Sequence, residues 1–417
     1  MGELPGVAPA APNGDRFEIL DALRGFALLG VLLANILGFC GWYDMSQEER
    51  LALSSEAGLA AWSFAHHAFL DGRFYSLFSL MFGIGFAVIL ARLSQRDASE
   101  ALNIFRRRLW VLLGIGLVHL CLIWFGDILV LYSLLGFVLV ACRNLSDRAL
   151  LIGAATLVLF PILGYALTWA MQIQPYAPFY DLGMYIDQAL APEHFKLPSL
   201  ERVRLEGWAA FMEWTLPGPP FRVGDLLQSW RLPKVMGIFM LGLWVGRRLV
   251  AGTLLNDRAL LIRVCKSGLL VGLPAGILLG LMPGQRGGPP SMEGLQATVL
   301  YAFAVVPMAL AYASGFVLLW QAGGERLLRH FAPVGRMALT NYLSQTILCI
   351  TIFYGLGLGM VGRFAPWQVV TTALTIYTGQ WLFSRWWLGR YAFGPMEWLW
   401  RSLTYRRRMP MLRVAAR

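Results

Sequence analysis

The apolar stretch LDALRGFALLGVLLANI, residues 20–36, constrains the fold of this chain more than any other part of its sequence. It suits a helix that crosses a bilayer, yet it contains Asp21, Arg24 and Asn35. On a helix that turns about 100° per residue, these three side chains fall within about 40° of one another. Asp21 and Arg24 are one turn apart and can pair, while Asn35 lies about 16 Å further along the axis. Ionisable groups are costly in lipid, so this face should turn towards protein or water, as a functional site or as a packing interface.

Hydrophobic stretches of membrane-spanning length recur along the whole chain. Of its 417 residues, 57% are hydrophobic and 14% are charged, whereas soluble proteins carry about 25% charged residues. The chain is therefore predicted to be an all-α polytopic membrane protein, a bundle of about ten transmembrane helices. The expected spans are residues 17–40, 73–92, 109–125, 128–142, 149–172, 233–250, 260–282, 294–320, 337–357 and 366–388.

The basic residues gather between alternate spans, which explains the net charge of +11 without a nucleic-acid partner. The positive-inside rule then places both termini in the cytoplasm. We expect residues 1–14 to be a disordered tail, residues 15–405 to form one transmembrane domain, and residues 406–417 to form a basic cytoplasmic tail. Residues 173–230 should form a long outer connection with short helices, and residues 392–408 should form an aromatic and basic interfacial helix. Gly83 and Gly85 are expected to allow close helix packing in the second span.

Several longer motifs resemble the YeiB-like family of bacterial inner-membrane proteins, which carry a domain of unknown function at the C-terminal end. The resemblance rests on RFYSLFSLMFGIGF (73–86), LLGIGLVHLCLIWFGDILVLYSLLG (112–136), VGRMALTNYLSQTILCITIFYGLGLG (334–359) and FGPMEWLWRSLTY (393–405). It covers residues 17–405, almost the whole chain.

The first span is also similar to a wider superfamily of transmembrane acyltransferases that includes heparan-α-glucosaminide N-acetyltransferase. Asp21, Arg24–Gly25 and Asn35 match the pattern of its first helix. The resemblance implies transfer of an acyl group from cytoplasmic acyl-CoA to an acceptor reached from outside. In that enzyme a catalytic histidine follows the asparagine, whereas the equivalent stretch here, GFCGWYDMSQEER (38–50), contains none. The YeiB-like pattern instead has a histidine in the third span, matched by His119.

Two histidine-containing groups on the outer side are the candidate catalytic residues. His119 and Asp127 flank the turn between the third and fourth spans, and the pair can act as a general base or simply hold that turn. His67 and Asp71 are one turn apart and can also pair, while the adjacent His66 points about 100° away, so only one of the two histidines can face the bundle. A solvated helix start is the structural alternative for this second group. No third residue with metal-ligand spacing accompanies them, and the five scattered cysteines suggest apolar packing, so no metal site is predicted.

A further set of polar residues is predicted to bind substrate or cofactor. Arg73, at the outer end of the second span, can neutralise Asp71 or Asp127, hold an anionic acceptor, or lie at the membrane interface. Arg336, Asn341 and Gln345 open the ninth span, where the amides can bind a pantetheine chain or bond to other helices. Arg24 and Arg336 can meet the phosphates of coenzyme A, and Asn35 can stabilise an oxyanion.

These residues favour an acyltransferase with acyl-CoA as co-substrate, no permanently bound cofactor, and a small-molecule or glycan acceptor. A transporter or exporter of a small solute through the same polar path is the main alternative, and a structural or sensory role is a third. The sequence contains no strand-linked GxGxxG, no GxxxxGK[ST] and no GxSxG, which excludes dinucleotide, ATP-loop and serine-hydrolase motifs. The lipid bilayer is the expected partner of such a chain. The sequence does not decide between a monomer and a homodimer.

Overall fold

The computed structural model describes residues 14–94, 98–282 and 289–412, and these residues are almost entirely helical. Within these ranges there is no β-strand, and the one ladder contact is an isolated bridge between Tyr391 and Leu412. The predicted all-α fold is therefore confirmed. The expected tails lie outside the described residues only at 1–13 and 413–417, and α1 already begins at Gly14. The described part of the C-terminal tail contacts the end of α18, where the Ala392 N–H donates to the Met411 carbonyl oxygen.

Each of the ten predicted spans coincides with a helix. These helices are α1 (Gly14–Phe39), α4 (Arg73–Ser94), α5 (Ala98–Leu122), α6 (Leu129–Ala141), α7 (Asp147–Met171), α12 (Arg231–Val250), α13 (Arg258–Leu281), α14 (Met292–Leu319), α17 (Ala338–Phe353) and α18 (Pro366–Arg390). Five helical stretches of the described chain are long and apolar enough to cross a membrane by themselves. By contrast, α6 and α17 have 13 and 16 residues and rise only about 20 and 24 Å, so they need the surrounding bundle to satisfy their ends.

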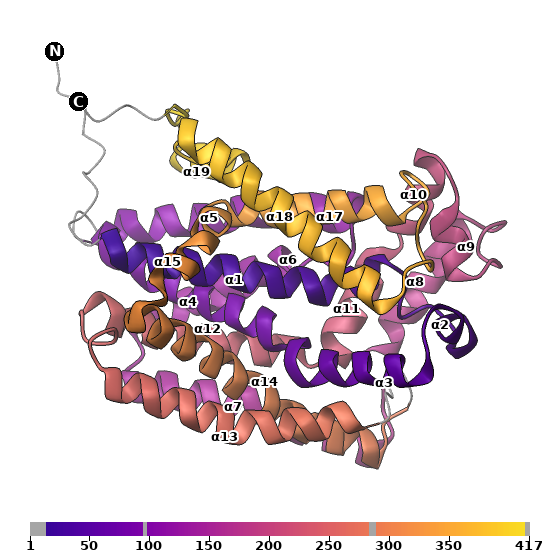
Figure 1. Cartoon of the computed structure of the whole chain (residues 1–417), viewed down its shortest axis with the longest axis horizontal. Coiled ribbons are helices and arrows are strands. Elements are labelled where there is room, and N and C mark those ends of the chain that lie inside the picture. Colours follow the sequence, from indigo (N-terminus) through magenta and orange to yellow (C-terminus); the bar gives the residue numbers. More distant parts are fainter. Residues whose placement is uncertain (1–13, 95–97, 283–288, 413–417) are drawn as a thin grey trace.

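The long helices run side by side and give the molecule two distinct ends (Figure 1). One end carries the first residues of α1 and α5 together with the C-terminal helix α19 (Pro395–Tyr405), and we call it the arginine-rich end because Arg24, Arg108, Arg336 and Arg401 lie there. The other, the loop end, carries the short helices α2 (Gln47–Leu53) and α8 (Ala177–Leu190), α9 (Ser199–Arg204), α10 (Trp208–Thr215) and α11 (Gly218–Gln228). The prediction of short helices in the long connection is confirmed.

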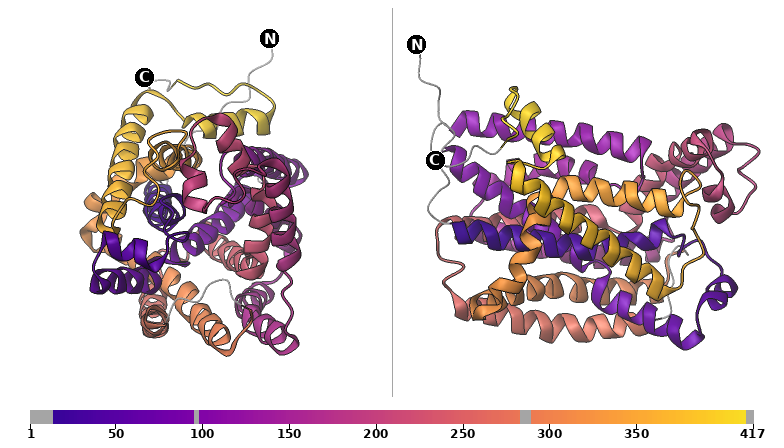
Figure 2. Two further views of the ribbon diagram at one scale, coloured as in Figure 1. Left: turned by 90° about the vertical axis from the view of Figure 1, so that its right-hand side faces the viewer. Right: turned by 45° about the horizontal axis from the view of Figure 1, so that its top comes forward.

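Helix α1 lies inside the bundle, surrounded by other helices when the molecule is viewed from the loop end (Figure 2, left). It contacts α4, α16 (Ala332–Arg336), α17 and α18. Its Leu28 and Ile36 belong to one hydrophobic core and its Leu23 and Ala27 to a second. The helix with the polar face is therefore a central wall of the fold, whereas α7 and α13 expose apolar side chains on the periphery.

The helix that enters α4 is broken. Residues of α3 (Glu56–Ala65) pass into a π-helical turn, η1 (His66–Leu70), which ends at Asp71 before α4 starts at Arg73. Gly72 makes the break with a φ of 83°, and a side chain there would collide with the Tyr301 hydroxyl. The break turns Asp71 away from a continuous helix face, since Asp71 has a φ of −57° and a ψ of 120°.

The two glycines of α4 serve different purposes. An added Cβ at Gly83 would overlap the carbonyl oxygen of Phe239 and lie 2.9 Å from the Cα of Gly242, so α4 and α12 touch backbone to backbone here. Gly85 has nothing within 4 Å of its Cβ position and faces a cavity. The close-packing prediction is confirmed for Gly83 and wrong for Gly85, because the neighbouring helix lies on the other side of α4.

We expect Gly83→Ala to lower the free energy of unfolding by about 1–3 kcal/mol, because the added methyl group has no room between α4 and α12. Gly85→Ala is the matched control and should leave it unchanged or raise it by about 0.5–1 kcal/mol, because alanine favours helix. Denaturant unfolding of the purified protein in detergent measures both values. Equal effects of the two variants would contradict the assigned packing.

Candidate functional site

One large cavity of about 1690 Å³ runs along α1 from the arginine-rich end to the loop end. Asp21, Arg24 and Asn35 all line it, as expected for residues that share one helix face. The predicted pair also forms, with 2.9 Å between Arg24 Nη1 and Asp21 Oδ1. Single pockets for drug-sized ligands occupy about 300–1000 Å³, so this cavity has room for an extended ligand or for two substrates.

The arginine-rich end of the cavity has a strongly positive lining. Six arginines face it, against the three carboxylates of Asp21, Glu100 and Glu397. The arginines are Arg24, Arg92, Arg108, Arg336, Arg401 and Arg407. Arginine groups of this kind are suited to phosphate, because each guanidinium can donate two parallel hydrogen bonds.

Helix α19 forms part of the cavity wall at this end. The Arg108 guanidinium lies 4.1 Å from the centre of the Trp400 ring, and Trp400 Nε1 donates to the Arg108 carbonyl oxygen. Glu397 accepts hydrogen bonds at 2.6 and 3.1 Å from the backbone N–H groups of Leu339 and Thr340, and so caps α17. Burial raises the pKa of Glu397, and these bonds act in the opposite direction. Sequence reasoning did not identify Glu397 or Trp400 as cavity residues. A glutamate within an aromatic and basic segment was the sequence pattern that could have indicated them.

The three residues expected at the start of the ninth span separate in the structure. Arg336 lines the cavity, whereas Asn341 and Gln345 are buried between helices. Asn341 donates to the carbonyl oxygen of Val334 and to Ser384, and Gln345 donates to Gln380. The two amides therefore join α17 to α16 and α18, as in the structural alternative, and lie outside the cavity surface.

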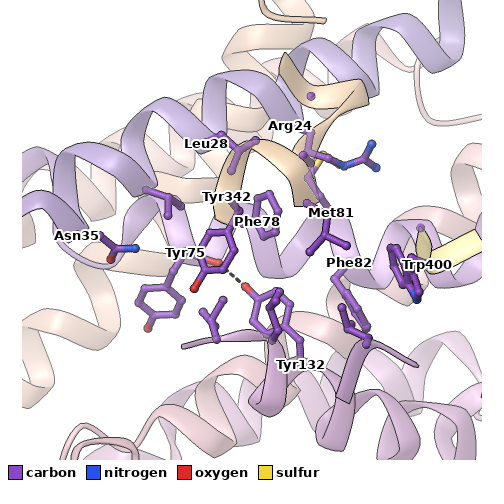
Figure 3. Close-up of a pocket in the computed structure, with 18 of the residues that line it drawn as sticks. Arg24, Leu28, Asn35, Tyr75, Phe78, Met81, Phe82, Tyr132, Tyr342 and Trp400 are labelled. Atoms are coloured by element: carbon purple, nitrogen blue, oxygen red, sulfur yellow. Dashed lines mark hydrogen bonds between the residues drawn. The ribbon is translucent and has the colours of Figure 1, made fainter. Parts of the chain in front are cut away.

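Three tyrosines occupy the middle of the cavity. Figure 3 shows Tyr75, Tyr132 and Tyr342 grouped between Asn35 on one side and Arg24 and Trp400 on the other. We call them the tyrosine cluster. The Tyr132 hydroxyl lies 2.7 Å from Ser79 Oγ and donates to the Tyr75 carbonyl oxygen, which fixes its ring. The sequence did not reveal this cluster, because its members come from α4, α6 and α17.

The break before α4 places charged groups at the loop end of the cavity. His66 is buried and lines the cavity together with Asp71, whereas His67 does not line it. The expectation that only one of the two histidines faces the bundle is confirmed. His67 Nδ1 lies 3.5 Å from Asp71 Oδ2, so these two residues are close, as predicted. Asp44, Arg222, Asp225 and Arg231 also line this end.

Arg73 stabilises the break between η1 and α4 from the side that faces away from the cavity. Its Nη1 donates to the carbonyl oxygens of His67 and Asp71 at 2.7 and 2.5 Å. The side chain is fully buried against α13 and is not part of the cavity lining. These bonds hold the η1–α4 break in place, a role that was not among those expected for Arg73 from the sequence.

His119 and Asp127 form a fully buried pair outside the cavity lining. His119 Nδ1 lies 2.8 Å from Asp127 Oδ2, and His119 Nε2 lies 3.0 Å from Thr346 Oγ1. Asp127 Oδ1 also accepts from the Val130 N–H, and its carbonyl oxygen accepts two bonds from Arg222. Because both ring nitrogens are engaged, this network supports the structural alternative, in which the pair holds α5, α6, α11 and α17 together. A catalytic role for the pair stays a prediction.

We expect His119→Ala to lower the free energy of unfolding by about 3–5 kcal/mol, since it leaves the Asp127 carboxylate buried without its partner. Thr346→Val, which removes one hydrogen bond, should cost about 1 kcal/mol. Unfolding in detergent followed by circular dichroism measures both. A fully stable His119→Ala protein would contradict the structural role.

No group of three or more His, Cys, Asp or Glu side chains suited to a metal ion occurs in the described part of the chain. All five cysteines are free thiols, and Cys40 and Cys349 are buried among apolar side chains.

Helical architecture and apolar spans, together with an internal cavity that has charged residues at both ends, define a polytopic helical membrane protein. Residues 245–407 match the family model described as "Protein of unknown function (DUF418)". The chain is 29% identical to the uncharacterized protein YxaH of Bacillus subtilis, covering 96% of this chain and 97% of that protein. It is 28% identical to the uncharacterized protein YeiB of Escherichia coli, covering 97% of this chain and all of that protein. These similarities support a YeiB-like family for this chain.

A more limited similarity joins the chain to the Na(+)/H(+) antiporter NhaA 2 of Novosphingobium aromaticivorans. The two are 26% identical over 178 residues, which is 35% of this chain and 46% of the antiporter.

Proposed function

We propose that the protein is a membrane acyltransferase that moves an acyl group from acyl-CoA to an acceptor on the opposite side of the bilayer. The observation that carries the proposal is the continuous cavity along α1, which joins the arginine-rich end to the loop end. Such a cavity lets two substrates that cannot share one aqueous phase meet inside the protein.

The arginine-rich end would take the donor. Its six arginines supply charge and paired donors for the phosphates of coenzyme A. The excess of basic residues at this end also favours the cytoplasmic side under the positive-inside rule, where acyl-CoA is available. From there the pantetheine chain would extend along α1 towards Asn35.

The acceptor would enter from the loop end, where His66 and Asp71 line the cavity. His66 would take the proton from the acceptor amine or hydroxyl as its nitrogen or oxygen attacks the thioester carbonyl carbon. The new C–N or C–O bond forms, the C–S bond breaks, and the departing thiolate takes up a proton. Asn35 would donate to the carbonyl oxygen while it carries negative charge.

Transport of a small anion is the second candidate, because a cavity lined from both ends of the bundle and a broken helix are also features of transporters. The partial similarity to a Na(+)/H(+) antiporter favours transport in general and not the anion, because the ions in that protein's name are cations. Transport requires no general base, so the two candidates differ in their dependence on His66.

We expect the purified protein to bind radiolabelled acyl-CoA and to catalyse thioester cleavage. Arg336→Gln and Arg401→Gln should each weaken acyl-CoA binding about tenfold or more, because each removes charge-assisted hydrogen bonds of about 1.5–3 kcal/mol. Arg326→Gln is the control, since Arg326 is exposed at the same end and does not line the cavity. Equilibrium binding and release of free thiol are the measurements.

The His66→Asn variant tests the proposed general base. It should retain acyl-CoA binding and lose acyl transfer. Absence of both binding and cleavage across several acyl chain lengths would refute the acyltransferase. Solute flux into proteoliposomes that persists in His66→Asn would favour transport.

A further inference from the structure

Among the donors that line the cavity, the hydroxyls of Tyr75 and Tyr342 and the Nε of Arg231 donate to no described residue. The Tyr75 hydroxyl lies beside that of Tyr301, and the Tyr342 hydroxyl lies beside the Ile128 N–H. Tyr342 is only 4% exposed. A buried donor without a partner costs about 1–3 kcal/mol, so three of them on one cavity wall indicate a ligand that accepts hydrogen bonds.

Two arginines converge on the same region. The Arg231 guanidinium carbon lies 4.2 Å from the centre of the Tyr75 ring. Arg222 is held by its two bonds to the Asp127 carbonyl oxygen and lies close enough to interact with both Arg231 and Tyr342. Burial lowers the pKa of Arg222, and the neighbouring positive charge of Arg231 lowers it further. An anionic group between the two guanidinium groups would relieve this repulsion.

Carboxylates line the loop end of the same cavity, so a purely anionic ligand would also meet repulsion. Asp44, Asp71 and Asp225 all face it, and Asp225 accepts a hydrogen bond of 2.7 Å from the Tyr180 hydroxyl, which holds it in place. A ligand with an ammonium group beside its anionic group matches both charges of the lining. Phosphate suits the anionic position, because its several oxygens can accept from all three unpartnered donors.

We propose that the central and loop-end parts of the cavity bind a small zwitterion, with its phosphate held by Arg231, Tyr75 and Tyr342 and its ammonium facing Asp71 and Asp225. The inference rests on the proposed function in identifying this zwitterion as the acyl acceptor, whose amine attacks after losing a proton to His66. The same chemistry occurs in a free phosphoamine and in the headgroup of an aminophospholipid.

Binding of O-phosphoethanolamine to the full-length protein in detergent, without acyl-CoA, tests the site directly. Trp124 and Trp214 line the cavity and provide a fluorescence signal, which calorimetry can check. We expect O-phosphoethanolamine to bind at least tenfold more tightly than ethanolamine or inorganic phosphate. Equal affinities for O-phosphoethanolamine and either fragment would overturn the proposal.

Two substitutions identify the residues. Tyr342→Phe removes one hydroxyl and should weaken O-phosphoethanolamine binding about fivefold to tenfold, while Arg231→Gln should weaken it more than tenfold. Tyr185→Phe is the control, because Tyr185 is 72% exposed on α8. The Tyr342 hydroxyl donates to no described residue, so its removal should change the unfolding midpoint little. Unchanged binding in a folded Tyr342→Phe protein would overturn the assignment.

The source of the ligand is tested in nanodiscs. If the natural ligand is a lipid headgroup, phosphatidylethanolamine nanodiscs should suppress O-phosphoethanolamine binding relative to phosphatidylglycerol nanodiscs, and if it is a free molecule both should permit binding. Either result supports the site. Zwitterion binding without any acyl transfer would refute the proposed function alone, whereas equally efficient transfer to ethanolamine would refute this inference alone.

Discussion

The free-energy cost of placing charged and amide groups at membrane depth determines how the helices of this protein are arranged. Asp21, Arg24 and Asn35 cannot face lipid without a large penalty, so α1 lies inside the bundle with its polar face on a cavity. The opposite faces of α1 belong to two hydrophobic cores, which hold the helix in this orientation. The remaining spans are arranged around it, and the outermost ones, α7 and α13, are those with the largest apolar exposure.

Short irregular segments place ionisable side chains at the cavity, while regular helices form its walls. The π-helical turn and Gly72 interrupt the helix before α4 and present His66 and Asp71, and Arg73 holds that break by donating to two carbonyl oxygens. Glu397 performs a similar task at the other end, where it caps α17 and ties α19 to the bundle. Backbone groups at membrane depth must be satisfied by protein, so these polar side chains are needed wherever a helix starts or breaks inside the bundle.

The polar residues of the spans separate into two classes by what their side chains reach. His119, Asp127, Asn341 and Gln345 have their hydrogen bonds filled by neighbouring helices and lie outside the cavity lining. Arg231, Tyr75 and Tyr342 line the cavity and keep donors without protein partners. A filled hydrogen-bonding network stabilises the bundle, whereas unfilled donors on a cavity wall are available to a ligand.

The sequence by itself determined the helical membrane fold, the position of nearly every span, and the polar face of α1. These features follow from local hydrophobic length and from the helical repeat, which are properties of consecutive residues. It also identified His67, Asp71, Arg24 and Arg336 as candidates, because ionisable residues within apolar stretches are conspicuous. Only the tertiary structure decided that Gly83 meets α12 while Gly85 faces the cavity, that His66 and not His67 lines it, and that α4, α6 and α17 contribute one tyrosine cluster. Those outcomes depend on which faces of helices far apart in the sequence contact one another. A local sequence pattern does not determine these contacts.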